Sequence, residues 1–289
     1  MLKNLNISIC GTGLMGTALG QKCCAAGVSV IAYNRTLEKT KPLESVGAQV
    51  VTAPQEAFER GNVILLVLSE KASIDGVLSQ CEDPVFKGKS VLQMGTIAPD
   101  ESQDLERFFG DRGARYLECP VLGSRKEAAA GTLILMAGGE PQVFEDVLDV
   151  LKLFASHPRY VGPVGKASTL KLAFNSLIIS HVVGFSLSLG LAQKGGVDVG
   201  QFMEMLRESS LYASMIEKKL PRWMDNNYAD PNFPVKHLLK DCNLIMEQMN
   251  AHEMSTDVLV AVHQLLENTM QLGLGEADYS AIYKTINNC

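Results

Sequence analysis

Short apolar runs and amphipathic stretches alternate along the first half of the chain. The apolar runs predict strands at residues 7–10, 28–33, 50–51, 62–68, 90–94, 115–118, 132–137 and 159–161. A helical period predicts helices from the glycine-rich turn at residues 11–16 to about residue 27, and at residues 37–46, 54–59, 100–109 and 141–155. The run at residues 62–68 is typical of a central parallel strand covered on both faces. This alternation predicts an α/β fold with a doubly wound, mostly parallel sheet.

Beyond residue 165 the strand patterns cease and only helical patterns remain. They predict helices at residues 166–194, 199–208, 215–224, 235–249, 256–272 and 280–286. The change occurs at Gly162-Pro163-Val164-Gly165, where glycine and proline interrupt both kinds of pattern. We therefore expect a sheet domain at residues 1–164 and an all-helical domain at residues 165–289.

One predicted helix raises the question of a membrane span. Residues 170–192 are largely apolar and long enough to cross a bilayer. They also include a lysine, an asparagine, a histidine and four serines, which are costly in lipid. We therefore expect no membrane association and a helix buried between protein layers. Because this helix is too apolar to stand alone, we expect it to pack within a homodimer or homotetramer as well as on the sheet domain.

Charge and cysteine content predict which partners and sites the protein lacks. The formal net charge of −6 argues against nucleic-acid binding, which needs clustered positive charge. Seven cysteines without regular spacing predict reduced thiols, and we expect a cytoplasmic protein. Cys23 and Cys24 are adjacent, which suits helix packing better than metal ligation, so we expect no metal site. The N-terminus runs directly into the first predicted strand, which leaves no room for a signal peptide.

The first strand, turn and helix have the spacing of a dinucleotide-binding motif. The turn reads Gly11-Thr12-Gly13-Leu14-Met15-Gly16. Gly11 permits the tight turn, Gly13 lets the backbone approach a pyrophosphate, and Gly16 lets the helix pack closely on the strand. The helix N-terminus offers N–H groups and a positive dipole end to the phosphates. We expect these residues to bind a dinucleotide, the alternative being an ordinary structural turn.

The residues after the second strand bear on the choice of dinucleotide. NAD-dependent proteins with this motif carry an acidic residue there, which bonds to the adenosine ribose. This chain has Asn34-Arg35-Thr36 instead. Arg35 offers a guanidinium to a 2′-phosphate, and Asn34 and Thr36 offer further hydrogen bonds. The pattern favours NADP(H), with NAD(H) possible; the alternative is a solvated arginine in a surface loop.

Five segments, taken in order, resemble the β-hydroxyacid dehydrogenase family over nearly the whole chain. They are the Gly11 turn with Asn34-Arg35-Thr36, then Gly95-Thr96-Ile97-Ala98-Pro99, Cys119-Pro120-Val121-Leu122-Gly123-Ser124 with Gly131-Thr132-Leu133, residues 165–175, and residues 233–241. The last segment is most similar to the glyoxylate/succinic semialdehyde reductase branch. The resemblance implies an NADP-binding Rossmann domain followed by a 6-phosphogluconate dehydrogenase-like helical domain for substrate binding and dimerisation.

By this resemblance Lys171 is the catalytic acid/base. An ammonium beside a carbonyl oxygen can stabilise the developing alkoxide and deliver a proton while a nicotinamide delivers hydride. The neighbouring Leu170, Leu172, Ala173 and Phe174 would desolvate the amine and lower its pKa. Asn175 lies one helical turn further along the same face, where it can orient Lys171 or the substrate. The alternative is a lysine that extends to solvent.

The resemblance also implies roles outside this helix. Thr96 matches a residue at the nicotinamide ribose, the alternative being an N-cap for the following helix. Lys240 matches a lysine near the cofactor, and Phe233 and Asp241 match positions with substrate or catalytic roles. For Lys240 and Asp241 a simple surface ion pair is the alternative.

The chain departs from the family at Leu122. The family usually has serine there, whose hydroxyl and following backbone amides hold the substrate carboxylate, and leucine cannot donate a hydrogen bond. The backbone N–H groups of Gly123 and Ser124 can still do so, and the Ser124 or Arg125 side chain is a substitute. A bulkier or more apolar substrate therefore becomes plausible.

The leading hypothesis is an NADPH-dependent reductase of a small aldehyde or keto acid, which acts in reverse as a hydroxyacid dehydrogenase. Imine reductases share the fold and the Asn-Arg-Thr signature but generally lack the helix lysine. Other relatives serve as non-catalytic dinucleotide-binding modules of larger chromatin proteins and have usually lost that lysine. Lys171 favours the first hypothesis over both alternatives. Leu122, which replaces the carboxylate-binding serine of the family, leaves the imine reductase as an alternative.

Overall fold

The computed structural model describes residues 5–288 and separates between Lys171 and Leu172 into two compact units. The first unit carries all of the strands assigned in the described chain, and the second is helical. The boundary that we expected between residues 164 and 165 lies just ahead of the long helix α8 (Lys166–Lys194). That helix begins in the first unit and continues into the second.

The described strands form one nine-stranded sheet in the order β3-β2-β1-β4-β5-β6-β8-β7, with β9 beside β8. The strands are β1 (Asn6–Cys10), β2 (Ser29–Tyr33), β3 (Gln49–Val51), β4 (Val63–Leu66), β5 (Ser90–Gln93), β6 (Arg115–Glu118), β7 (Val121–Leu122), β8 (Ile134–Gly139) and β9 (Arg159–Gly162). All pairs from β3 to β6 are parallel, whereas β8 runs antiparallel to β6 and β7. The predicted doubly wound, mostly parallel sheet is therefore confirmed.

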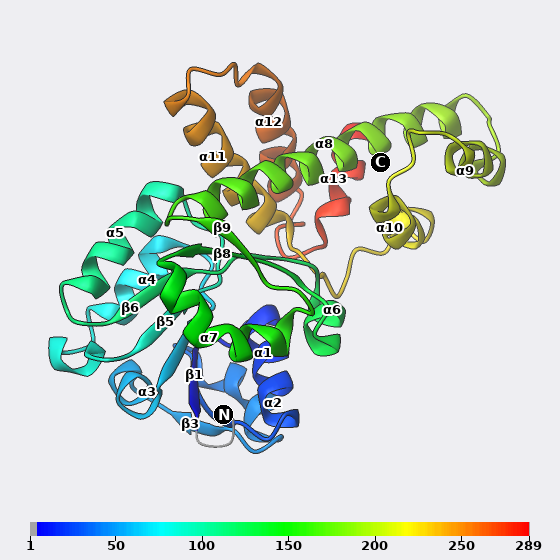
Figure 1. Cartoon of the computed structure of the whole chain (residues 1–289). Helices are drawn as coiled ribbons and strands as arrows, with labels where there is room; N and C mark the ends of the chain where they lie inside the picture. The colour runs from blue at the N-terminus through cyan, green and yellow to red at the C-terminus, as the bar shows by residue number, and fades with distance from the viewer. Residues whose placement is uncertain (1–4, 289) are drawn as a thin grey trace. The chain divides into compact units, whose positions relative to one another are not determined.

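Helices cover both faces of this sheet (Figure 1). One apolar core contains side chains of α1 (Leu14–Ala25), α2 (Lys41–Glu44), α6 (Arg125–Ala130) and α7 (Pro141–Phe154). The core on the other face contains side chains of α3 (Pro54–Arg60), α4 (Lys71–Leu78), η3 (Asp83–Phe86) and α5 (Pro99–Gly110). β4 is buried along its whole length between the two cores, which explains its continuous apolar sequence.

The strand order places a switch point between β1 and β4. The chain proceeds from β1 outward to β2 and β3, and then returns to β4 and proceeds outward on the other side. In open α/β sheets ligands bind outside the carboxyl ends of the strands at such a point. The glycine turn at residues 11–16 follows β1 directly and therefore lies at this edge.

Several local features of the first unit differ from the sequence expectation. The helix expected at residues 37–46 is a 3-10 turn, η2 (Leu37–Thr40), followed by the short α2. Pro42 explains the break, because proline has no N–H to continue the ladder and is accepted only at the start of a helix. The helices α4 and α6, the 3-10 helix η3 and the strand β7 were not expected from the sequence. None of them is longer than 8 residues, so each offers little periodicity.

The second unit packs its helices around one apolar core. They are the remainder of α8, α9 (Val199–Glu208), α10 (Ser214–Met224), α11 (Val235–Ala251), α12 (Asp257–Gln271), η4 (Tyr279–Ala281) and α13 (Ile282–Asn287). The predicted helices match closely. A buried ion pair joins Lys219 of α10 to Asp278 beside η4, with Nζ 2.6 Å from Oδ2. This pair ties two helical segments that lie far apart in the sequence.

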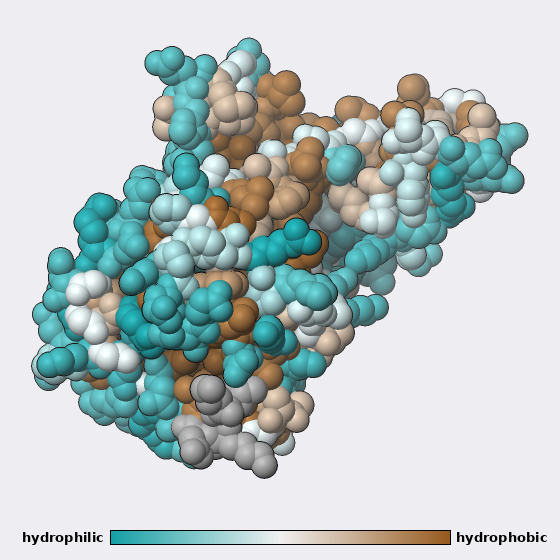
Figure 2. Space-filling model, in the orientation of Figure 1, coloured by the Kyte–Doolittle hydropathy of each residue, from teal (hydrophilic) through white to brown (hydrophobic). Residues whose placement is uncertain are grey.

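The helix α8 is long and apolar enough to cross a membrane by length and composition alone, with a mean hydropathy of 1.6 in its most apolar window. Only 39% of that window is buried inside the described chain. One side of the helix packs into the core of the second unit, whereas Leu177, Leu187 and Leu191 are 52%, 55% and 77% exposed. The described chain therefore buries α8 on one face, and not between two protein layers as we expected. The space-filling view shows apolar residues at the surface of the helical unit (Figure 2).

Candidate active site

The glycine turn has the geometry that the sequence predicted. Gly11 adopts a φ of 103°, which disfavours other residues, and its N–H donates to the carbonyl of Tyr33 at 2.9 Å. A methyl carbon added at Gly16 would lie 1.9 Å from the Gly11 oxygen, so helix α1 can approach the turn only because Gly16 has no side chain. At Gly13 an added methyl carbon would meet nothing within 4 Å. The turn therefore presents open space over Gly13.

The N-terminus of α1 suits a bound phosphate group. Gly13 is the N-cap, and it offers no side-chain cap; no acidic residue lies in the first turn of this helix in the described chain. Leu14 and Met15 lie in that turn. Because the first N–H groups of a helix have no partner within it, they can donate to an anion. This arrangement fits the diphosphate of a dinucleotide.

Asn34 connects the glycine turn to the loop after β2. Its Oδ1 accepts the Thr12 N–H at 3.1 Å, and its Nδ2 donates to the Thr36 carbonyl at 2.9 Å. The Thr12 hydroxyl donates to the Lys39 carbonyl at 2.9 Å. Asn34 therefore holds the loop after β2 against the glycine turn, whether or not it also bonds to the cofactor. Arg35 in the same loop is exposed.

The end of β5 and the segment that follows it contain Thr96 and Gln93. Thr96 is not the N-cap of α5, because that position belongs to Ala98, whose N–H donates to Glu101 Oε2 at 2.8 Å. The N-cap alternative for Thr96 is therefore excluded. Sequence reasoning missed Gln93 at the end of β5: its side chain is fully buried, and neither amide atom has a hydrogen-bond partner in the described chain.

Gly123 and Ser124 lie between β7 and α6. Ser124 is the N-cap of α6, and its N–H donates to Glu127 Oε2 at 2.8 Å. Its hydroxyl also contacts Glu127. A substrate carboxylate at Ser124 would therefore have to replace Glu127 there. Gly123 adopts a φ of 130°. Their role in substrate binding stays a prediction.

Lys171 lies on α8 and is half-buried. Four residues further along the same helix, Asn175 is buried, with 1% of its surface exposed. Phe174 is 36% exposed and Ala173 is exposed as well. The apolar residues adjacent to Lys171 in sequence therefore point in different directions, and only Leu172 among them is buried.

In the second unit Asn175, Asp241 and Lys240 form a connected polar cluster. The Asn175 Nδ2 donates to Asp241 Oδ2 at 2.6 Å, and Lys240 Nζ lies 2.7 Å from Asp241 Oδ1. Asp241 is 1% exposed, so this is not a surface ion pair. The Asn175 Oδ1 is buried and accepts no hydrogen bond from the described residues. It is available to a donor such as an ammonium or a substrate hydroxyl.

Phe233 stands just before α11 and is half-buried. Its ring stacks on His237 with centroids 6.3 Å apart and meets Tyr279 edge to face at 5.8 Å. Its carbonyl accepts the Tyr279 N–H at 2.9 Å. Burial, followed by Lys236 and Lys240, lowers the pKa of His237. These two ring contacts fix the orientation of the Phe233 side chain.

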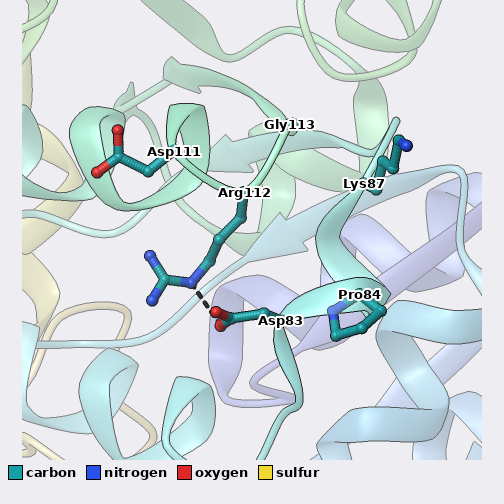
Figure 3. A pocket seen from close by; sticks show the side chains of 6 residues that line it. All are labelled: Asp83, Pro84, Lys87, Asp111, Arg112 and Gly113. Atoms are coloured by element: carbon teal, nitrogen blue, oxygen red, sulfur yellow. Dashed lines mark hydrogen bonds and ion pairs between the residues drawn. The ribbon is translucent and has the colours of Figure 1, made fainter.

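A hollow of about 310 Å³ lies elsewhere on the first unit (Figure 3). Its lining consists of Asp83, Pro84, Lys87, Asp111, Arg112 and Gly113, with an ion pair of 2.7 Å between Arg112 and Asp83. These residues precede β5 and β6, so the hollow lies at the amino ends of the strands. It is therefore separate from the edge that carries the glycine turn.

Residues 5–288 contain no group of three or more His, Cys, Asp and Glu that could hold a metal ion. The cysteines in that range are free thiols, and Cys23 is buried in α1. Burial raises the pKa of the Cys10 and Cys119 thiols, which keeps them protonated and unreactive.

Two family models match the chain. Residues 6–162 match the NAD binding domain of 6-phosphogluconate dehydrogenase, and residues 165–286 match the model described as NAD-binding of NADP-dependent 3-hydroxyisobutyrate dehydrogenase. The chain is 29% identical to glyoxylate/succinic semialdehyde reductase 1 of Arabidopsis thaliana, with 98% of both proteins covered.

Two further similarities differ in coverage. The chain is 28% identical to the cytokine-like nuclear factor N-PAC of Drosophila melanogaster over 94% of its own length, but it spans only 46% of that relative. Among solved structures, a 3-hydroxyisobutyrate dehydrogenase from Salmonella typhimurium has a TM-score of 0.88 at 22% identity. That match covers 97% of this chain and 99% of the other.

Proposed function

The chain belongs to the β-hydroxyacid dehydrogenase family, whose members are NAD(P)-dependent dehydrogenases and reductases acting on CH–OH groups, and we propose that it reduces a small aldehyde or keto acid with NADPH. Glyoxylate and succinic semialdehyde are the first substrates to test, because a relative of Arabidopsis thaliana that aligns with 98% of this chain carries their names. In the reverse direction the enzyme would oxidise a hydroxyacid.

The observation that carries this proposal is the placement of Lys171 and Asn175 on one helix. Residues four apart on a helix share a face, so the lysine precedes a buried amide by one turn. The Lys171 ammonium can donate a hydrogen bond and then a proton to the carbonyl oxygen of the substrate. NADPH supplies the hydride when it is bound.

The cluster around Asp241 fixes the orientation of the Asn175 side chain. The Asn175 amide is oriented by its bond to Asp241, which leaves Oδ1 as an acceptor. Lys240 compensates the charge of the Asp241 carboxylate in this buried position. This arrangement holds Asn175 in one rotamer, so that it can orient the Lys171 ammonium or a substrate hydroxyl.

On the cofactor side, the glycine turn and the N-terminus of α1 would hold the diphosphate, and Arg35 would reach the 2′-phosphate. Thr96 would contact the nicotinamide ribose. The exposed guanidinium and the absence of a carboxylate at residues 34–36 support NADPH over NADH.

An assay of NADPH oxidation at 340 nm tests the proposal with glyoxylate, succinic semialdehyde and a cyclic imine. We expect carbonyl turnover, and a loss of about 10²- to 10⁴-fold in kcat for Lys171→Ala, because a general acid contributes that much. Lys166→Ala is a matched control, since Lys166 is an exposed lysine on the same helix. NADPH affinity should survive in both variants.

The same assay discriminates the alternatives. Imine turnover that persists in Lys171→Ala would indicate an imine reductase, a possibility that Leu122 keeps open. Tight NADPH binding without turnover of any carbonyl would indicate a non-catalytic dinucleotide-binding module. Carbonyl turnover unchanged in Lys171→Ala would refute the role of Lys171.

The exposed leucines of α8 support a homodimer or homotetramer as the working form. Leu177, Leu187 and Leu191 are apolar side chains that a second copy of the chain would cover. Sedimentation equilibrium measures the assembly. A monomer at micromolar concentration, or an assembly that Leu191→Glu leaves unchanged, would contradict this expectation.

A further inference from the structure

Glu118 is a buried carboxylate that the proposed chemistry does not use. It ends β6, and its exposed fraction is 0%. In the register of the sheet it stands beside Gln93 of β5 and Gly138 of β8. A charged group so placed needs strong hydrogen-bond partners, because burial removes its hydration.

Glu118 accepts hydrogen bonds from the first residues of α8 and from Gly165 just before it. Oε1 accepts the N–H groups of Gly165 at 2.8 Å and Ala167 at 2.7 Å, and Oε2 accepts the Ser168 hydroxyl at 2.6 Å. These lengths are typical of bonds to an ionised carboxylate. The first N–H groups of a helix lack partners within it, and a negative charge there is favoured by the helix dipole. Glu118 therefore caps α8 from a neighbouring strand.

Closely packed neighbours hold the Glu118 carboxylate in one position. A methyl carbon at Gly138 would meet Glu118 Oε1 closer than real side-chain carbons approach, so the space exists only because residue 138 is glycine. Ala167 and Ser168 are themselves buried. Gly165 adopts a φ of 98°, which turns the chain from β9 into the helix. The first turn of α8 is thus fixed both along its axis and in rotation.

Lys171 follows Ala167 by four residues, which is about one turn or about 6 Å along the axis. Both residues and Glu118 belong to the first unit. The bonds of Glu118 therefore act directly on the segment that presents the lysine. An error of about 1 Å in the placement of a reacting group can cost about 100-fold in rate.

We infer that Glu118 is a positioning residue for the reaction: it holds the first turn of α8 on the end of β6 and so places the Lys171 ammonium against the carbonyl oxygen of the substrate. The inference rests on the proposed function of Lys171. It concerns a fully buried carboxylate whose hydrogen bonds lead to the start of α8.

The test is Glu118→Gln, which keeps the size of the side chain but replaces one acceptor oxygen with an N–H₂ donor that faces a donor of α8. We expect kcat for the carbonyl substrate to fall by about 10- to 100-fold. NADPH affinity, measured by fluorescence titration, should change less than about twofold, since the glycine turn follows β1 and is not touched. Glu106→Gln is the matched control. Glu106 is a carboxyl of α5 whose pKa is raised by burial and then by the nearby Glu118, and no hydrogen bond joins it to α8 among the described residues. Its kcat should be unchanged.

A double-mutant cycle separates positioning from general loss of structure. If Glu118 acts through Lys171, Glu118→Gln should cause no further loss of kcat in the Lys171→Ala background. Losses that multiply would show a structural role unrelated to Lys171 and would overturn the inference. Should Glu118→Gln fail to fold, Ser168→Ala removes one of the three bonds. It should lower kcat by about three- to tenfold and be silent in the same background.

The two levels of the argument fail differently. Full activity of Lys171→Ala would refute the proposed function itself. Loss of activity in Lys171→Ala together with unchanged kcat in Glu118→Gln and Ser168→Ala would refute only the positioning role.

Discussion

Substitutions at Gly13 and Gly16 should distinguish an effect on cofactor affinity from an effect on folding stability. Both belong to the same turn, but their surroundings differ. A methyl carbon at Gly16 would lie 1.9 Å from the Gly11 oxygen, whereas real contacts stay beyond 3.0 Å, so the turn and the helix would have to separate by about 1.1 Å. At Gly13 a methyl carbon would stand in open space.

Gly16→Ala should therefore damage both properties. Overpacking of this kind costs about 1–3 kcal/mol of folding free energy. The displaced helix N-terminus should also weaken its charge-assisted bonds to the cofactor phosphates, each worth about 1.5–3 kcal/mol, and so lower NADPH affinity by about 10- to 100-fold. Gly13→Ala should cost no more than about 1 kcal/mol of stability: this residue is exposed and its φ of −71° suits alanine, but alanine is a poorer N-cap than glycine. It should weaken NADPH binding at least about tenfold, because the methyl group occupies the approach of the pyrophosphate.

Urea denaturation measures the first quantity and fluorescence titration with NADPH the second. Gly76→Ala is the matched control: this glycine lies in α4 with nothing within 4 Å of an added methyl carbon. It should gain up to about 1 kcal/mol from helix propensity and bind NADPH as before. Parent-like NADPH affinity in Gly13→Ala would mean that the pyrophosphate does not cross this turn. Equal destabilisation by Gly13→Ala and Gly16→Ala would mean that the two glycines do not have separate roles.

Three further predictions concern the cofactor, the helical core and pH. Arg35→Asp should shift the ratio of kcat/KM for NADPH to that for NADH by at least about tenfold toward NADH, and an unchanged ratio would refute the role of Arg35. Asp278→Asn should destabilise the helical unit by about 3–5 kcal/mol, because it leaves the buried ammonium of Lys219 unpaired; urea unfolding followed by Trp223 fluorescence measures this. Glu276→Gln, which breaks an exposed ion pair, should cost less than about 1 kcal/mol. Equal losses of stability in the two variants would contradict this account. Burial, as the largest cause, holds the pKa of His237 below its usual 6.5, so just below that pH the unfolded chain binds more protons than the folded chain. Stability should therefore decrease as the pH is lowered through that range, by at most about 1.4 kcal/mol per pH unit. His237→Gln should remove this part of the slope, and an unaltered slope would exclude His237 as its source.

The elements that the sequence predicted well have strong local signals. The run at residues 62–68 became the fully buried β4, and the turn from Gly11 to Gly16 took the expected conformation. The helices of the second unit also lie close to their predicted bounds. Periodicity and turn chemistry are properties of neighbouring residues, so they can be read before the chain is folded.

Local signals failed where one residue or a short segment decided the outcome. Pro42 divided an expected helix into η2 and α2. The helix α6 is only a short alanine-rich segment, made recognisable in the structure by the capping box of Ser124 and Glu127. That pairing of serine and glutamate three residues apart was visible in the sequence and could have indicated the helix.

The sequence by itself determined the doubly wound sheet, the dinucleotide turn and the identity of the residues that carry the proposed chemistry. The tertiary structure decided their partners: Asp241 for Asn175, and the start of α8 for Glu118. These partners stand 66 and about 50 residues apart in the chain, where no periodic pattern connects them. A buried polar group is satisfied by whichever donor or acceptor the packing brings to it, so its partner is known only once the chain has folded.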